Sequence, residues 1–256
     1  SVAAAYENWL TLSGLENRVA ERTRELAETN AELESFARTV SHDLRAPLRA
    51  MEGFAAALAE DYGHQIDEEG QEFIQHIIDS AKRLDGMVAD LLAYSRLGRT
   101  ELRVTSIALN DIVSEALNRL SSETASRNAK LHVESGMPSI TGHKSTLVQV
   151  VTNLISNAVK FVPQEIQPEV KVWAESQPDG YVRLTAQDNG IGIDPAYQQR
   201  IFQVFERLHG IESYPGTGIG LAIVARACER LGGSYGMESQ PGSGSRFWVA
   251  FPNRNL

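Results

Sequence analysis

The sequence predicts a multidomain protein: an α-helical hairpin that dimerises into a four-helix bundle behind an N-terminal coiled coil, followed by an α+β two-layer sandwich. Three observations predict this class. Apolar residues recur at helical spacing through the first third of the chain, and a short polar turn separates two such stretches. Beyond about residue 98 the pattern changes to helices mixed with strand-like runs and Gly- and Pro-rich loops. A chain of 256 residues can hold two modest domains.

The first helix has an apolar seam at alternating steps of three and four residues. Sustained spacing of this kind over several turns indicates helices paired as a coiled coil. Arg22 and Thr29 place polar side chains on the seam, and one long amphipathic helix packed within its own chain is the alternative. We favour the coiled coil. The seam consists of Leu12, Leu15, Val19, Arg22, Leu26, Thr29, Leu33, Phe36 and Val40.

The hairpin is predicted from a second amphipathic stretch. The first pattern continues through Leu58 to a polar turn at residues 61–64. The helix beyond it carries apolar residues at Ile74, Ile77, Ala81, Leu84, Val88 and Leu91. Two long helices joined by a short turn form an antiparallel hairpin. One hairpin leaves much of its apolar face exposed, so we expect two copies to pair in a homodimer.

Beyond the hairpin, the runs predict an α+β domain with a mainly antiparallel sheet. Helices are expected at 109–120, 145–161 and 222–231, and strands at 130–134, 170–174, 181–187 and 247–251. The resulting domain boundaries are 1–36 for a signal-transmitting helix, 37–104 for the hairpin and 105–256 for the α+β domain.

Composition excludes some partners. The chain is 42% hydrophobic and 22% charged, which is typical of a soluble globular protein. A net charge of −9 without a basic patch argues against nucleic acid or an anionic membrane as partner. Neither a bilayer-spanning run nor a signal peptide is evident, and a single cysteine, Cys228, indicates a reducing compartment, so we expect a cytoplasmic location without direct membrane contact. A start at Ser1 rather than Met indicates a piece of a larger parent protein.

The sharpest motif is Ser-His-Asp-Leu-Arg-Ala-Pro-Leu at residues 41–48. His42 lies off the apolar seam, so its imidazole is expected to face outward. Asp43 beside it can hold the ring tautomer and accept a proton while the free nitrogen attacks phosphorus. Pro47 removes one helical hydrogen bond and loosens the helix nearby. A surface His-Asp pair on a helix that contains a proline is the alternative explanation.

A polar stripe marks the helix that begins near Ser145. Gln149, Asn153, Asn157 and Lys160 follow one another at steps of four, four and three, and so share one face. Two amides and an ammonium group can hold a hydrated Mg²⁺ and the phosphates bound to it. The alternative is a solvated helix face, but asparagine is a poor helix former that such a face has little reason to repeat.

Two glycine motifs complete the pattern. Asp-Asn-Gly-Ile-Gly-Ile-Asp at 188–194 follows a strand, where a carboxylate can accept from an exocyclic amine such as that of adenine. Gly-Thr-Gly-Ile-Gly-Leu at 216–221 opens an apolar helix and exposes backbone N–H groups to phosphate. Plain glycine turns are the competing explanation. A stretch at 208–215 between them is expected to close over a nucleotide.

The order of these motifs resembles sensor histidine kinases of two-component systems. S-H-D-L-R-A-P-L, N-L-I-S-N-A-V-K-F, D-N-G-I-G-I-D, F-Q-V-F-E-R and G-T-G-I-G-L-A-I follow one another from about Phe36 to the end of the chain. The first motif is similar to that of kinases with phytochrome or PAS-type sensors. The resemblance implies a dimerisation and histidine-phosphotransfer hairpin joined to a Bergerat-type ATP-binding domain, shared with gyrase, heat-shock chaperone ATPases and mismatch-repair ATPases.

The resemblance also implies roles for particular residues. His42 would be the phosphoacceptor and Asp43 its activating acid, with Arg45 and Asn153 in the catalytic set. Asn157 would bind Mg²⁺, Lys160 would lie near the phosphates and Asp188 would recognise adenine. The remaining ATP-binding residues would be Gly190, Gly192, Phe205, Arg207, Gly216, Thr217, Gly218, Gly220 and Leu221.

The implied activity is autophosphorylation of His42 by Mg-ATP, followed by transfer to an aspartate on a response regulator receiver domain. An upstream sensor domain is expected in the parent protein. Ala46 stands where family members with strong phosphatase activity carry Thr or Asn, so weak phosphatase activity is expected. The rival functions are a signalling scaffold that binds nucleotide without transferring phosphate, and a plain ATPase of the same superfamily.

Overall fold

The computed structural model describes residues 2–97, 104–208, 214 and 216–253. Its chain divides into two compact units, Ser1–Ile78 and Asp79–Leu256. No helix in the described ranges has an 18-residue stretch that is apolar enough to cross a membrane.

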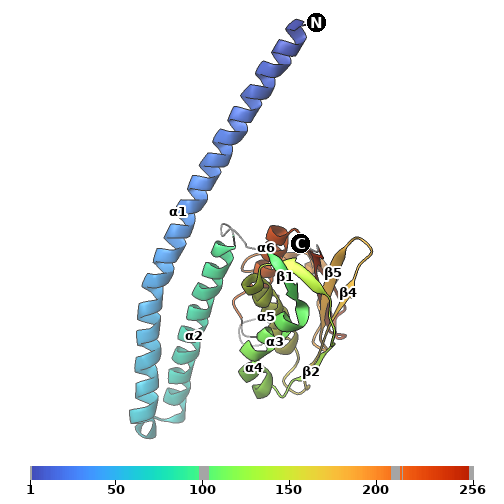
Figure 1. The fold of residues 1–256 in the computed structure, drawn as a ribbon. Coiled ribbons are helices and arrows are strands. Elements are labelled where there is room, and N and C mark those ends of the chain that lie inside the picture. The colour runs from blue at the N-terminus through green and yellow to red at the C-terminus, as the bar shows by residue number, and fades with distance from the viewer. Residues whose placement is uncertain (1, 98–103, 209–213, 215, 254–256) are drawn as a thin grey trace. The chain divides into compact units, whose positions relative to one another are not determined.

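The first unit is a helical hairpin (Figure 1). Helix α1 covers Val2–Tyr62 and runs on through Pro47 without a break. A short 3₁₀ turn, η1 at Gly63–Gln65, reverses the chain, and α2 covers Glu68–Arg96. Asp67 caps α2, because its Oδ1 accepts a hydrogen bond of 2.9 Å from the backbone N–H of Gly70. The predicted hairpin and its turn are therefore confirmed.

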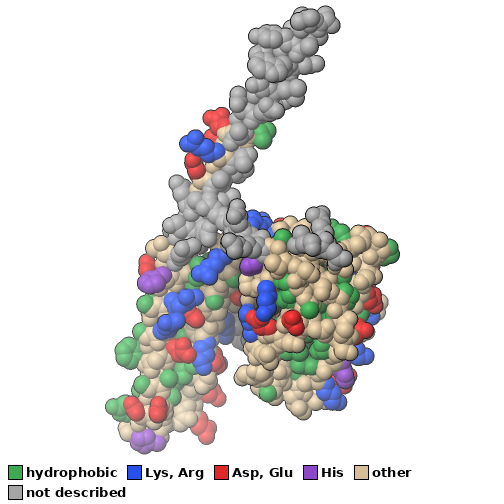
Figure 2. Space-filling model, in the orientation of Figure 1, with side chains coloured by type: hydrophobic (Ala, Val, Ile, Leu, Met, Phe, Trp, Pro, Cys, Tyr) green, Lys and Arg blue, Asp and Glu red, His purple; other side chains and the backbone are tan. Residues whose placement is uncertain are grey.

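The hairpin has a small core within the first unit. Ala55 of α1 packs with Ile74 and Ile78 of α2, and Ile66 of the turn covers them. Other large apolar side chains stay exposed on the same two helices: Phe54 is 77% exposed, Phe73 59% and Ile77 50%. Figure 2 shows hydrophobic side chains at the surface of this hairpin. Most side chains of the predicted coiled-coil seam, namely those of Leu12, Leu15, Leu26, Leu33 and Phe36, lie outside the described residues.

The second unit is built on a five-stranded sheet in the order β2-β4-β5-β7-β6. These strands cover Lys130–Val133, Glu169–Ser176, Tyr181–Gln187, Ser245–Pro252 and Ser234–Ser239, respectively. The β2–β4 pair is parallel and the other three pairs are antiparallel. The mainly antiparallel sheet is confirmed. Strand β6 was not predicted, because Gly236 and the polar ends of the run hide its alternation.

Helices cover one face of this sheet (Figure 1). They are α3 at Leu109–Arg119, α5 at Lys144–Lys160 and α6 at Gly220–Leu231, while the short α4 spans Ser121–Ser126. Alternate residues of β4 and β5, such as Val172 and Leu184, point into the core beneath them. The two-layer sandwich expected from the sequence is therefore confirmed.

A second, two-stranded sheet pairs β1 at Thr105–Ala108 with β3 at Ser139–Gly142. Both strands are four residues long, which is too short for the alternation of a strand to stand out in the sequence. Two 3₁₀ turns, η2 at Pro195–Tyr197 and η3 at Arg200–Phe202, follow β5.

The division between the two units falls inside α2. Leu91, Tyr94 and Leu97 pack against the core of the second unit, so the end of this helix belongs with the sandwich. The domain boundary at 104/105 that the sequence indicates stays a prediction.

Candidate active site

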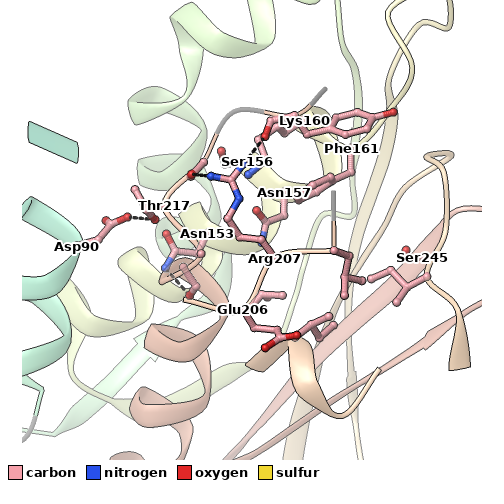
Figure 3. Close-up of a pocket in the computed structure, with 18 of the residues that line it drawn as sticks. Asp90, Asn153, Ser156, Asn157, Lys160, Phe161, Glu206, Arg207, Thr217 and Ser245 are labelled. Carbon is pink, nitrogen blue, oxygen red and sulfur yellow. Dashed lines mark hydrogen bonds between the residues drawn. The ribbon is translucent and has the colours of Figure 1, made fainter. Parts of the chain in front are cut away.

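A cavity of about 710 Å³ opens in the second unit. This volume lies within the range of about 300–1,000 Å³ that is typical of small-molecule sites. Its walls come from α5, the end of β5, the loop before α6 and the second half of α2. Figure 3 shows many of the lining side chains.

The polar stripe of α5 faces this cavity. Asn153, Asn157 and Lys160 line it, while Leu154, Ile155 and Ala158 of the same helix are buried in the core. Among the described residues, none forms a hydrogen bond with the Asn157 carboxamide, so its oxygen is available to a ligand. The helix is thus placed by its apolar face and presents its amides to the cavity, as the spacing predicts.

Asn153 has a positioning role in this arrangement. Its Nδ2 donates to the backbone carbonyl of Gly220 at 3.0 Å, and its Oδ1 accepts from Gln149 at 3.1 Å. The side chain therefore joins the middle of α5 to the first residue of α6. A Cβ at Gly220 would lie 3.6 Å from the Asn153 side chain, which is ordinary contact.

Lys160 supplies a positive charge at the cavity. Burial, and after it the nearby Arg207, lower the pKa of Lys160 to about 8, and Glu123 and Asp90 offset part of this lowering. The ammonium group also lies 4.3 Å from the centre of the Phe161 ring. At neutral pH the lysine stays mostly protonated and can attract phosphate oxygens.

Two residues of this region escaped the sequence analysis. The hydroxyl of Ser156 donates to both carboxylate oxygens of Glu123 at 2.9 and 3.1 Å, and both residues line the cavity. Glu123 lies on the short α4, where no motif marks it. Only the fold brings it beside the polar stripe of α5.

Asp188, directly after β5, also lines the cavity. Its Oδ1 accepts backbone hydrogen bonds from Gly190 at 2.8 Å and Ser245 at 3.0 Å. Burial nevertheless raises the pKa of Asp188 to about 6, because desolvation outweighs those two bonds. The carboxylate is therefore ionised at neutral pH, and the fold fixes it at the wall of the cavity as an acceptor.

The glycines after Asp188 permit close backbone approach. Gly192 has a φ of +70°, and a Cβ there would lie 1.9 Å from the carbonyl oxygen of Gln240. A Cβ at Gly190 would lie 2.4 Å from the carbonyl oxygen of Phe161. Gly192 lines the cavity, whereas Gly190 supports Asp188 from behind through its backbone N–H.

The second glycine motif forms the loop that leads into α6. Gly216, Thr217, Gly218, Gly220 and Leu221 all line the cavity. The N-terminus of α6 at Gly220 thus lies at the cavity, where unpaired N–H groups and the helix dipole favour an anion.

Arg207 holds this loop in place. Its guanidinium donates to the carbonyl oxygens of Gly216 at 2.6 Å and Tyr214 at 3.0 Å. Phe205 is placed differently from the other predicted residues. Its side chain is 61% exposed and does not line the cavity, while its backbone N–H donates to the carbonyl oxygen of Gly218 at 2.9 Å. Most of the expected closing segment at 208–215 lies outside the described residues.

The motif at residues 41–48 that is predicted to hold the phosphoacceptor lies on α1, in the first unit. The side chain of His42 is 87% exposed, as the sequence predicts, and its Nδ1 lies 3.2 Å from Oδ1 of Asp43. Arg45 is half-buried on the next turn, and Ser41 is buried.

The chain thus combines a helical hairpin that carries an exposed His-Asp pair with a sandwich whose cavity is lined by Lys160 and the N-terminus of α6. The family model described as "His Kinase A (phospho-acceptor) domain" matches residues 32–100. The model described as "Histidine kinase-, DNA gyrase B-, and HSP90-like ATPase" matches residues 142–255. The chain belongs to the sensor histidine kinase family.

Curated relatives agree with this assignment. Phytochrome-like protein Cph1 of Synechocystis is 35% identical over 93% of this chain, and the match covers 31% of Cph1. Circadian input-output histidine kinase CikA of Synechococcus elongatus is 32% identical over 94% of this chain and 34% of its own length. Sensor-like histidine kinase SenX3 of Mycobacterium tuberculosis is 33% identical over 88% of this chain and 55% of its own length. The chain thus spans about a third of the first two proteins.

Solved structures share the fold. Full-length ShkA, crystallised in complex with AMPPNP, has a TM-score of 0.65 and 28% identity, over 85% of this chain and 45% of ShkA. Histidine kinase AdeS of Acinetobacter baumannii has a TM-score of 0.57 over 84% of this chain and 98% of AdeS, at 21% identity, which shows the fold alone.

Proposed function

We propose that the chain uses Mg-ATP to phosphorylate His42 and then passes the phosphoryl group to an aspartate of a response regulator receiver domain. The observation that carries the proposal is the joint presence, in one chain, of an exposed, carboxylate-paired histidine and a cavity lined by Lys160, the glycine loop and the N-terminus of α6. Each part has its own place in the phosphotransfer step.

His42 is poised as a nucleophile. The Asp43 carboxylate can only accept a hydrogen bond, so the contact at 3.2 Å places the proton of a neutral imidazole on Nδ1. The lone pair is then on Nε2, which can attack the γ-phosphorus of ATP. An Nε2–P bond forms, the bond from phosphorus to the β–γ bridging oxygen breaks, and ADP leaves. The Nδ1 proton passes to Asp43 as the phosphorylated ring becomes neutral again.

The cavity can hold ATP with its two ends distinguished. Asp188, ionised and held by two backbone N–H groups, accepts from the exocyclic amine of adenine. The glycine loop, the N-terminus of α6 and Lys160 offer N–H groups and positive charge to the phosphates. Fixing both ends orients the γ-phosphate, and orientation with electrostatic stabilisation accounts for most of the catalysis in phosphoryl transfer.

Mg²⁺ fits the residues at the phosphate end. The ion prefers a few oxygen ligands and keeps several waters, and the Asn157 amide oxygen together with ATP phosphates offers such a set. Bound there, Mg²⁺ would neutralise phosphate oxygens. Asn157 is the protein ligand that we expect, and the Asn153 carboxamide stays occupied by its bond to Gly220.

We also propose a homodimer. The apolar side chains of Phe54, Phe73 and Ile77 are more than half or about half exposed on the hairpin, and a second copy can cover them in a four-helix bundle. The relatives extend well beyond the matched region, which supports an upstream sensor domain in the parent protein, and three of them are phytochromes or phytochrome-like. A phytochrome-type or PAS-type sensor is the form that we expect.

The direct test is incubation of the chain with γ-labelled ATP and Mg²⁺, beside a His42→Gln variant. Acid-labile, base-stable label that disappears in the variant is expected, because a P–N bond hydrolyses in acid. A purified receiver domain should then remove label from the kinase.

Two results would contradict the proposal. Nucleotide binding without any covalent label, in the presence of the sensor domain as well, would indicate a scaffold. Release of phosphate from ATP at the same rate in wild type and His42→Gln would indicate a plain ATPase.

A further inference from the structure

The second half of α2 forms one wall of the cavity, although every recognised nucleotide motif lies elsewhere in the chain. This half, from Asp79 on, belongs to the same compact unit as the sandwich. Asp79, Arg83, Gly86 and Asp90 are spaced by four, three and four residues and share one face of the helix. All four line the cavity.

Asp90 makes a specific contact with the glycine loop. Its Oδ2 accepts a hydrogen bond of 2.6 Å from the hydroxyl of Thr217, which stands between Gly216 and Gly218 (Figure 3). This bond joins residues 127 positions apart in the sequence. The hydroxyl of Thr217 also lies 3.3 Å from the backbone N–H of Ile219, just before α6. Asp90 therefore binds the loop that we expect to receive the phosphates.

Gly86 lies beside Thr217 in this contact. A Cβ at Gly86 would lie 3.9 Å from the Cγ2 of Thr217, which is ordinary van der Waals contact, so the loop passes close to the helix at this turn. An alanine would therefore fit, whereas a larger side chain would meet the loop.

The charges at this contact oppose a bound triphosphate. Burial raises the pKa of Asp90, and this effect outweighs the hydrogen bond from Thr217 and the attraction of Lys160, which both lower it. The net direction is upward, so the carboxylate in this position has lost hydration. A phosphate group at the loop would need the same Thr217 hydroxyl and the same Lys160 ammonium group, and Asp90 would repel it.

We propose that Asp90 is an autoinhibitory latch: when α2 lies against the sandwich, Asp90 occupies the Thr217 hydroxyl and offsets the positive charge of Lys160, and so competes with the phosphates of ATP. The latch rests on the proposed nucleotide site. It assigns α2 a role in setting nucleotide affinity. The presentation of His42 is a separate role, and it belongs to α1.

The test compares ligand affinities by isothermal titration of the whole chain. Asp90→Ala is expected to bind ATP about tenfold more tightly than wild type, equivalent to about 1.4 kcal/mol. The gain should be smaller for ADP and absent for adenosine, which lacks the competing phosphates. Glu72→Ala, which removes a carboxylate from an exposed position of the same helix in the first unit, is the matched control and should change none of the three affinities.

Gly86 offers a second route that leaves the charge in place. Gly86→Leu should push α2 off Thr217 and raise ATP affinity as Asp90→Ala does, whereas Gly86→Ala should keep the affinity of wild type. Unchanged or weaker ATP binding by Asp90→Ala would overturn the latch, because Asp90 would then not compete with phosphate. If the wild-type chain bound neither adenosine nor ATP, the nucleotide site itself would be wrong.

Discussion

Gly192→Ala should destabilise the second unit through two separable effects. Gly192 has a φ of +70°, where a residue with a Cβ costs about 1–2 kcal/mol. The added Cβ would also lie 1.9 Å from the Gln240 carbonyl oxygen, and such overpacking costs about 1–3 kcal/mol. Together they amount to about 2–5 kcal/mol, which is a large share of the roughly 5–15 kcal/mol that stabilises a typical fold.

Two other glycines separate these effects. Gly180 has a φ of +80° with no atom within 4 Å of a Cβ, so Gly180→Ala should show the strain alone, about 1 kcal/mol. Gly190 is outside the left-handed region but its Cβ would lie 2.4 Å from the Phe161 carbonyl oxygen, so Gly190→Ala should show the steric effect alone. Gly190→Ala should also weaken adenosine binding, because the new Cβ would lie 2.8 Å from Oδ1 of Asp188 and displace that carboxylate.

The measurement is urea unfolding of the three variants and wild type, with thermal unfolding as a second probe. A loss of about 1 kcal/mol lowers the Tm of a domain of this size by roughly 2–4 °C, so the three variants should rank clearly. If Gly192→Ala lost no more stability than Gly180→Ala, the close approach of the Gln240 carbonyl would be refuted.

Four further predictions concern single residues. Because the pKa of Lys160 is about 8, ATP affinity should fall as pH rises through 8 and the ammonium group loses its proton; Lys160→Arg should remove that fall, as titrations across this pH range would show. Burial raises the pKa of the Cys228 thiol to about 12, so thiol reagents should label it only after denaturation, and rapid labelling of the native chain would contradict this. Ala46→Thr should speed dephosphorylation of a phosphorylated receiver domain, and equal rates in wild type would refute the weak phosphatase activity that we expect. Insertion of one residue near Ala27 rotates the two sides of the helix relative to each other by about 100° and should therefore alter the rate of autophosphorylation. An unchanged rate would argue against signalling through helix register.

Local pattern was enough to predict the elements that position most of the site. The polar stripe of α5 works as a prediction because helical spacing alone puts Asn153, Asn157 and Lys160 on one face. Asp188 and the glycines were found because strand ends and helix starts expose backbone to ligands. The predicted ATP-binding residues line the cavity, with two exceptions: Gly190 supports Asp188, and the side chain of Phe205 is exposed.

The residues that the sequence did not reveal depend on tertiary contacts. Glu123 reaches the cavity through its bond with Ser156, 33 positions away. Asp90 lies in an amphipathic helix whose apolar stripe alone was predicted, and its partner Thr217 is 127 positions away. Short strands such as β1 and β3 pair across more than 30 residues, so their stability comes from that pairing rather than from local pattern.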